Sequence, residues 1–293
     1  MPNDSLLTVG VPLHNGGEQL HECLECLRTQ TFTEFNVIIF ENHSTDDSLS
    51  IAEAFASKDN RFTIQRSSSF LDGATNFKRA INVCAASSKY FMLRAHDDYT
   101  SPQFLEEMIK VLESNPDKDL AVSNVVFVRD GNQRTAKLAA RIVEPNYFNT
   151  VWRLNAKLGF PGSWYYGLYR GKQSADIMID TIERYPSPWA GDMLSAMRFI
   201  TQNKAIFVPQ IFFYCTVAGS PFNKYAAKSI RAKIRARKIY HQILFTCQFT
   251  ERPKTVLKNA AFWVLCFRAA RKHTGYKTRH LVRQFVKNGW RFN

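Results

Sequence analysis

The sequence lacks long hydrophobic runs. Its longest apolar stretch, Ala260–Phe267, is far shorter than the roughly 20 residues that a membrane-spanning helix needs. The N-terminus has no charged region followed by an apolar one, so we expect no secretory signal peptide. Both features exclude the usual signals for membrane insertion or secretion, and they predict a cytoplasmic protein.

The chain is also poor in cysteine, with 6 among 293 residues. Cys23 and Cys26 form a C-x2-C pair, but they lie in a segment with the apolar spacing of a helix. No second pair of this kind and no paired histidines complete a zinc site. We therefore interpret them as reduced thiols of a cytoplasmic protein rather than as metal ligands.

Acidic residues almost disappear from the last part of the chain. Residues 222–293 contain 18 Lys and Arg but a single acid, Glu251, which gives this part a charge of +17. Since the whole chain carries +14, the preceding residues carry −3. This asymmetry indicates an anionic partner for the C-terminal part, such as a membrane surface, a nucleic acid or another polyanion.

Segments typical of strands alternate with segments typical of helices up to residue 128. We expect strands at 6–11, 36–40, 61–65, 90–93 and 120–128, and helices at 18–30, 46–57, 76–86 and 103–114. This alternation predicts an α/β fold with a mostly parallel central sheet and helices on both faces. After residue 130 the pattern weakens, and successive basic helices are expected after Pro221.

Three polar loops follow strands of the expected sheet, at 12–17, 41–47 and 96–99. Ligands bind beyond the carboxyl ends of strands in such sheets, so these loops should converge. The last loop holds two adjacent carboxylates, Asp97 and Asp98. A turn before a helix capped at Ser101 would explain them without a ligand. The convergence of the loops favours a bound cation instead.

Three segments taken in order resemble the nucleotide-sugar half of family 2 glycosyltransferases. They are VGVPLHNGGEQLHECLECLRTQTF, VIIFENHSTDDS and YFMLRAHDDYTSPQFLEEM, and the later WAGDML is similar to that family's acidic catalytic motif. The resemblance implies the GT-A fold. It divides a catalytic domain at 1–221 into a nucleotide-sugar-binding half, 1–125, and an acceptor-binding half, 126–221. A basic helical C-terminal extension, 222–293, would follow.

In the resembling family the loop after the fourth strand holds a divalent metal. By this resemblance Asp98 would bind Mn²⁺ or Mg²⁺, and Asp97 would reach the ribose or share the metal. Such a cation takes a few carboxylate ligands together with phosphate oxygens and water. The chain departs from the family at Ala95, where an acid is usual.

The resemblance also implies how the nucleotide is held. Its contacts would come from Pro12, His14, Asn15, Glu41, Asn42, Lys78 and Arg79. The family usually has two Asp where this chain has Glu41 and Asn42, so the preference for uridine should be weaker, although an amide can still pair with a base. For Lys78 and Arg79, the alternative is that they lie on a solvated helix face. For the loop that contains Asn42, the alternative is that its polar residues only form a turn.

Asp192, in WAGDML, matches the general base of the family. It would take the proton of an acceptor hydroxyl as that oxygen attacks the anomeric carbon, which inverts the configuration. A base must lie within hydrogen-bonding distance of the hydroxyl. The alternative is an N-cap aspartate.

The sequence therefore predicts a metal-dependent inverting glycosyltransferase. It would move a sugar from a nucleotide sugar, a UDP-sugar by resemblance, to a saccharide or lipid-linked saccharide in surface polysaccharide or glycan synthesis. One alternative is a nucleotidyltransferase of related fold, which would want a basic phosphate loop that His14–Gly17 lacks. The other is a non-catalytic basic binding protein. We expect no nucleic-acid partner, because no zinc, RRM or helix-turn-helix pattern is present.

Two segments of the extension have the character of interfacial helices. Ser229–Tyr240 combines isoleucines with many cations, and Ala261–Phe267 is apolar and followed by Arg268. Such helices lie in the surface of an anionic membrane, so we expect peripheral attachment at the cytoplasmic face. The alternative is a basic helical cap that packs on the catalytic body.

Overall fold

The computed structural model describes residues 5–136, 140–144, 158–187, 189–217, 227–246 and 256–275. Its strands are β1 (Leu7–Leu13), β2 (Phe35–Glu41), β3 (Phe62–Arg66), β4 (Tyr90–Leu93), β5 (Tyr99–Thr100), β6 (Leu120–Arg129), β7 (Asn132–Thr135), β8 (Leu168–Arg170) and β9 (Ala205–Thr216). Its α-helices are α1 (Gly17–Arg28), α2 (Ser48–Lys58), α3 (Gly73–Ser87), α4 (Phe104–Ser114), α5 (Gly171–Arg184), α6 (Gly191–Thr201), α8 (Ile230–Thr246) and α9 (Val256–His273). Short 3₁₀ helices are η1 (Ala140–Val143) and η3 (Gly162–Tyr166).

The N-terminal half is built on parallel strands. β1 pairs with β2 and with β4, and β2 pairs with β3, all in parallel. Every residue of β1 and β4 is buried, as expected for strands covered on both faces. The flanking helices present apolar stripes to this sheet; α4, for example, buries Phe104, Leu105, Met108, Ile109 and Leu112. The predicted α/β fold is confirmed.

The second half of the sheet has mixed direction. The strand order is β3-β2-β1-β4-β8-β6-β9-β5, with β7 paired to β6. β8 runs antiparallel to both β4 and β6, whereas β9 runs parallel to β6 across a bulge at Ser123 and Asn124. β5 runs antiparallel to the end of β9. As a result, the chain that follows β4 is hydrogen-bonded to the chain near residue 216.

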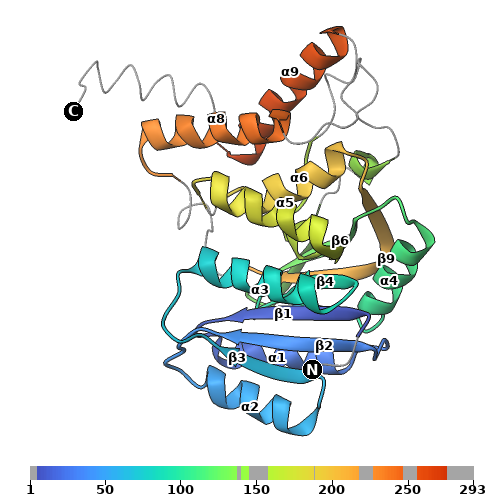
Figure 1. Cartoon of the computed structure of the whole chain (residues 1–293), viewed down its shortest axis with the longest axis vertical. Coiled ribbons are helices and arrows are strands. Elements are labelled where there is room, and N and C mark those ends of the chain that lie inside the picture. Colours follow the sequence, from blue (N-terminus) through green and yellow to red (C-terminus); the bar gives the residue numbers. More distant parts are fainter. Residues whose placement is uncertain are drawn as a thin grey trace.

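The helices α3, α5, α6, α8 and α9 form a continuous stack along the long axis of the molecule. Figure 1 shows β1–β3 at one end of this axis and α8 and α9 at the other. Tyr240 of α8 is fully buried, with its ring against Tyr185 and against His273 of α9. The two basic helices therefore pack on the α/β body.

The predicted boundary between Pro221 and Phe222 lies outside the described residues. Within those described ranges, no helix is long and apolar enough to cross a membrane.

Candidate active site

The loops that follow β1 and β2 are joined by hydrogen bonds. The imidazole Nδ1 of His14 lies 2.9 Å from the Asn42 carbonyl oxygen, and the Asn15 side chain accepts from the Thr45 N–H at 2.8 Å. The Ser48 hydroxyl accepts from the Gly16 N–H at 2.8 Å. Pro12 is buried within β1, whereas His14 and Asn15 are exposed beyond it. The two loops thus form one surface at the carboxyl edge of the sheet.

The Asn42 amide is directed at the chain itself. It donates to the Leu71 carbonyl at 2.8 Å and accepts from the Leu71 N–H at 2.9 Å. Its oxygen also accepts from the Ser67 hydroxyl at 3.2 Å. Both polar atoms of this buried side chain are therefore occupied. These contacts show that Asn42 fixes the loop between β3 and α3.

Glu41 is fully buried and pairs with Arg66 at 2.9 Å. Burial raises the pKa of its carboxyl, but hydrogen bonds from Ser44 and His43 and the charge of Arg66 outweigh this effect and lower the pKa. Glu41 is therefore held as a carboxylate that organises the second loop.

The two cations on α3 have protein partners. Lys78 forms an ion pair with Glu183 at 3.3 Å. Arg79 donates to the Gln65 carbonyl at 2.8 Å, and its guanidinium lies over the Phe40 ring at 5.3 Å. Lys78 is thus paired with α5, and Arg79 is held against the sheet, so either side chain would have to exchange its partners to bind a phosphate.

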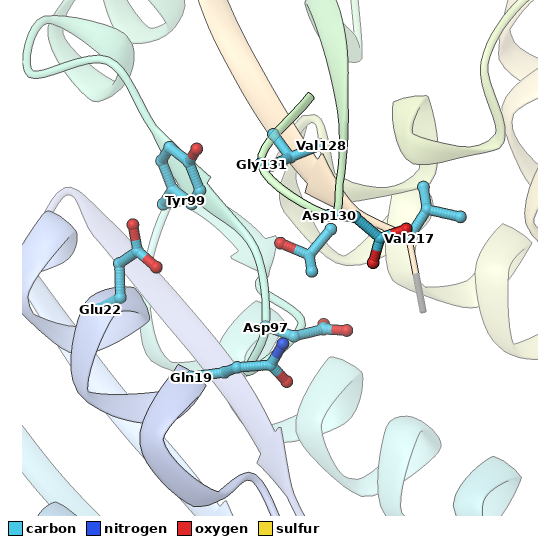
Figure 2. A pocket seen from close by; sticks show the side chains of 9 residues that line it. Gln19, Glu22, Asp97, Tyr99, Val128, Asp130, Gly131 and Val217 are labelled. Carbon is cyan, nitrogen blue, oxygen red and sulfur yellow. The ribbon is translucent and has the colours of Figure 1, made fainter. Parts of the chain in front are cut away.

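Asp97 and Asp98 have different surroundings. Asp97 is half-buried and lines a cavity of about 370 Å³, together with Glu22, Tyr99 and Asp130 (Figure 2). Asp98 is buried, and its Oδ1 accepts a hydrogen bond of 2.9 Å from the Thr216 N–H. Burial, followed by the charge of Asp97, raises the pKa of Asp98 to about 7.

A buried arginine lies behind this acidic pair. Arg94 is fully buried at the end of β4, donates to the Thr100 hydroxyl at 3.3 Å and lies over the Phe213 ring at 5.0 Å. Its Nε and Nη1 have no hydrogen-bond partner within the described ranges. Its charge partly offsets the rise in the pKa of Asp98. Arg94 was not predicted as a site residue, although it directly precedes Ala95-His96-Asp97-Asp98, which we call the AHDD loop.

The acidic pair is suited to a divalent cation. Carboxylates are the hard oxygen ligands that Mg²⁺ and Mn²⁺ take, and the charge of Arg94 only partly offsets the effects of burial and of Asp97 on Asp98. Across the part of the chain that the structure describes, no cluster of three or more His, Cys, Asp or Glu could hold a metal ion. The pair alone fits a cation whose other ligands are phosphate oxygens and water.

Asp192 lies in the first turn of α6. Ala190, which precedes this helix, has a left-handed backbone with φ of 67°. The Asp192 carboxylate accepts from the Met193 N–H at 2.7 Å, yet burial outweighs this contact and raises its pKa to about 6. It lies directly against Gly162 of η3, because a Cβ placed on Gly162 would collide with the Asp192 Oδ2. The Asp192 carboxylate can therefore occupy this position only while residue 162 is glycine.

Tyr166 of η3 is influenced by both groups of acids. Burial raises the pKa of its hydroxyl well above the usual value, and the charges of Asp98, Asp192 and Asp97 each raise it further. Its ring stacks on Phe213 at 5.9 Å. η3 therefore connects the two acidic sites, because its Gly162 lies against Asp192 and its Tyr166 contacts β9, the strand that holds Asp98. The adjacent Trp164 and Tyr165 are core residues that are 1% and 6% exposed.

The segment that carries Asp192 is connected to the C-terminal helices. The Trp189 indole Nε1 donates to the Thr274 carbonyl at 3.2 Å, at the end of α9. The neighbouring His273 is buried, and its ring nitrogens contact the Tyr240 hydroxyl and the Leu158 carbonyl. The end of α9 therefore supports the loop that leads into α6.

Comparisons with known proteins agree with this geometry. Residues 8–174, more than half of the chain, match the model of glycosyl transferase family 2. Glycosyltransferase GlyG of Streptococcus pneumoniae is 29% identical over 119 residues, which cover 41% of this chain and 38% of that protein. The putative glycosyltransferase EpsH of Bacillus subtilis is 31% identical over 114 residues, 39% of this chain and 32% of that protein. The chain thus spans less than two fifths of either relative.

Solved structures extend the likeness to nearly the whole chain. TarS of S. aureus, residues 1–349 in complex with UDP-GlcNAc, superposes with a TM-score of 0.58 at 16% identity, covering 98% of this chain and 93% of that one. Mannosyltransferase PcManGT from Pyrobaculum calidifontis, in complex with GDP-Man and Mn²⁺, gives 0.50 at 14% identity, covering 98% and 80%. These structures share the GT-A fold with this chain. The chain belongs to glycosyl transferase family 2.

Proposed function

We propose that the protein moves a sugar from a UDP-sugar to a saccharide or lipid-linked saccharide acceptor, with inversion, in surface polysaccharide or glycan synthesis. The observation that carries this proposal is that η3 links the two acidic sites: its Gly162 lies against Asp192, and its Tyr166 stacks on Phe213 of β9, the strand whose Thr216 holds Asp98. In this reaction one acid removes the proton of the acceptor hydroxyl, and the acids of the AHDD loop assist departure of the diphosphate. The two must therefore lie on opposite sides of the anomeric carbon. The UDP-GlcNAc complex of TarS supports a uridine donor.

Asp192 acts as the general base. Its raised pKa, about 6, makes it a stronger base than an ordinary aspartate while leaving it ionised at neutral pH. It takes the proton of the acceptor hydroxyl while that oxygen forms a bond to the anomeric carbon. The bond from this carbon to the diphosphate oxygen breaks in the same displacement, which inverts the anomeric configuration. Gly162 permits the carboxylate to occupy its position.

Asp97 and Asp98 would hold Mn²⁺ or Mg²⁺, and the Mn²⁺ complex of PcManGT supports this choice. When bound, the cation would neutralise charge on the diphosphate leaving group. Asp97 faces the cavity, and Asp98 is fixed by Thr216. The nucleoside would lie on the joined loops that contain His14, Asn15 and Glu41. We further propose that residues 1–221 form the catalytic domain and that 222–293 hold it at an anionic membrane surface.

Sugar transfer from a panel of nucleotide sugars, with and without Mn²⁺, tests this proposal. We expect Asp192→Asn to retain UDP binding and to lose transfer by roughly a hundred- to ten-thousand-fold. Asp176→Asn, at an exposed acid on α5, is the matched control. Nucleotidyl transfer from a nucleoside triphosphate, with release of pyrophosphate, would instead support the alternative enzyme class. Near-normal transfer by Asp192→Asn would overturn the role of the base.

A further inference from the structure

Helix α9 exposes an apolar face. Ala260, Trp263, Val264, Phe267 and Arg271 are all exposed, and their spacing places them on one side of the helix. Trp263 is 46% exposed and Phe267 is 41% exposed. We name Trp263, Val264 and Phe267 the α9 patch. Apart from Phe70 and Ile234, these are the large hydrophobic side chains exposed in the described ranges.

The opposite side of α9 is already used for packing. Phe262, Leu265 and Cys266 are buried, and the Phe262 ring stacks with Phe245 of α8 at 6.0 Å. Helix α9 therefore has more apolar surface than its packing on α8 buries. A helix that is apolar on two sides is expected to bury both of them.

The patch is held in a defined arrangement. The rings of Trp263 and Phe267 stack at 5.9 Å with an interplanar angle of 6°. His241 of α8 packs edge-to-face on Trp263 with the ring centroids 4.8 Å apart, and it also contacts Phe267. These contacts hold the two aromatic side chains outward, so less side-chain entropy is lost when a partner covers them.

The surroundings of the patch are strongly basic. α8 carries five Lys or Arg and α9 carries four, and neither helix contains Asp or Glu. Exposed cations include Arg235 and Lys238 of α8 and Arg271 and Lys272 of α9. Two copies of this surface facing each other would bring like charges together, which disfavours a homodimer through this face.

We propose that the α9 patch inserts into the headgroup region of an anionic lipid bilayer, with the cations of α8 and α9 against the lipid phosphates. Trp and Phe beside Lys and Arg are the composition of interfacial helices. A nucleic acid would match the charge, but it would leave Val264 without an apolar partner, and the stacked rings of Trp263 and Phe267 already cover part of each other. The inference rests on the proposed function in one respect: attachment would bring the protein to its lipid-linked acceptor.

Vesicle flotation of the full-length chain tests the inference without any donor or acceptor. Wild-type protein should float with vesicles of phosphatidylcholine and phosphatidylglycerol, and not with phosphatidylcholine alone. The double variant Trp263→Ser, Phe267→Ser should reduce the fraction bound to anionic vesicles by at least about tenfold, because it removes most of the apolar area that the bilayer would bury. Phe70→Ser, at the other exposed aromatic, is the matched control and should float as wild type does.

Circular dichroism and thermal unfolding must show that the double variant is folded. Should it unfold, the double variant Trp263→Gln, Phe267→Gln, which keeps longer side chains over α8, replaces it. Unchanged flotation of the folded variant would overturn the inference, as would equal binding to neutral vesicles. Binding to an oligonucleotide but not to vesicles would also overturn it. If the membrane inference fails, the protein should still transfer sugar to a free saccharide. This result would therefore be distinguishable from a failure of the proposed function.

Discussion

Asp98 accepts a hydrogen bond of 2.9 Å from the backbone N–H of Thr216, a residue 118 positions later in the chain. This contact joins the loop after β4 to the end of β9, and it separates the roles of two adjacent acids. Asp98 is fixed inside the fold, whereas Asp97 lines the cavity. The pair is thus one anchored carboxylate and one that is accessible to a ligand.

Substitution should separate these roles. Asp97→Asn should lower the Mn²⁺-dependent affinity for UDP by at least about tenfold, the effect of losing one charged ligand, at unchanged thermal stability. Asp98→Ala should also destabilise the fold by about 1–3 kcal/mol, because it leaves the Thr216 N–H without its acceptor. Calorimetry with UDP and Mn²⁺, paired with denaturant unfolding, measures both effects. Equal stability losses in the two variants would contradict the division.

Gly162→Ala should impair catalysis more than stability. The added Cβ would collide with the end of the Asp192 side chain, which can rotate away at little cost to the fold. We expect transfer to fall by about tenfold or more, because a displaced base no longer reaches the acceptor hydroxyl. Gly73→Ala is the control, since a Cβ there meets nothing within 4 Å. Normal turnover of Gly162→Ala would show that the carboxylate acts from another position.

Asp192 should make the free protein less stable as pH rises. Its pKa is raised to about 6 from 3.8, so between these values the folded chain holds a proton that the unfolded chain has released. Stability linked to this group is present at low pH and is lost as pH rises toward 6. Asp192→Asn should therefore be more stable than wild type at pH 7, by roughly 1–3 kcal/mol, and equal to it near pH 4.

Denaturant unfolding of both proteins across this pH range measures that difference. His273, whose pKa burial lowers to about 4, titrates in the same range with the opposite sign, but it is present in both proteins and cancels. A difference between the two proteins that does not change with pH would refute the assignment of a raised pKa.

Asn42→Asp should weaken nucleotide binding without selecting a base. A carboxylate at this buried position would face the Leu71 carbonyl, to which the amide now donates at 2.8 Å. We expect a stability loss of about 1–3 kcal/mol and similar losses of affinity for UDP, GDP, TDP and CDP. Competition binding with these four ligands measures the outcome. A sharper preference for UDP would indicate instead that residue 42 contacts the base.

The sequence was most informative where burial is continuous. The apolar runs of β1, β2 and β4 and the stripes of α1 and α4 lie within a few residues of their predicted ranges, because burial on both faces leaves little choice of residue. β8 has three residues, and β9 contains Pro209 and pairs with β6 across a bulge. Short or interrupted strands leave no clear periodicity, so neither was predicted.

The candidate site, like the fold, was predicted only in part from the sequence. Loops at the ends of parallel strands were predicted to converge, because topology alone brings them together. The occupation of the Asn42 amide by Leu71, the fit of Asp192 against Gly162 and the burial of Arg94 depend on contacts between distant segments. A linear pattern shows which polar residues follow a strand, but it does not show where their hydrogen bonds go.

Under the proposed membrane attachment, the hydrogen bond from Trp189 to Thr274 would give α9 a second role, in acceptor choice. It connects the segment that leads to Asp192 with the helix whose outer face is proposed to lie on lipid. With α9 on a bilayer, the Asp192 carboxylate would stand at one set height above the membrane plane. A lipid-linked glycan would react only where its terminal hydroxyl rises to that height. The enzyme would then select its acceptors by the length of the glycan as well as by its chemistry.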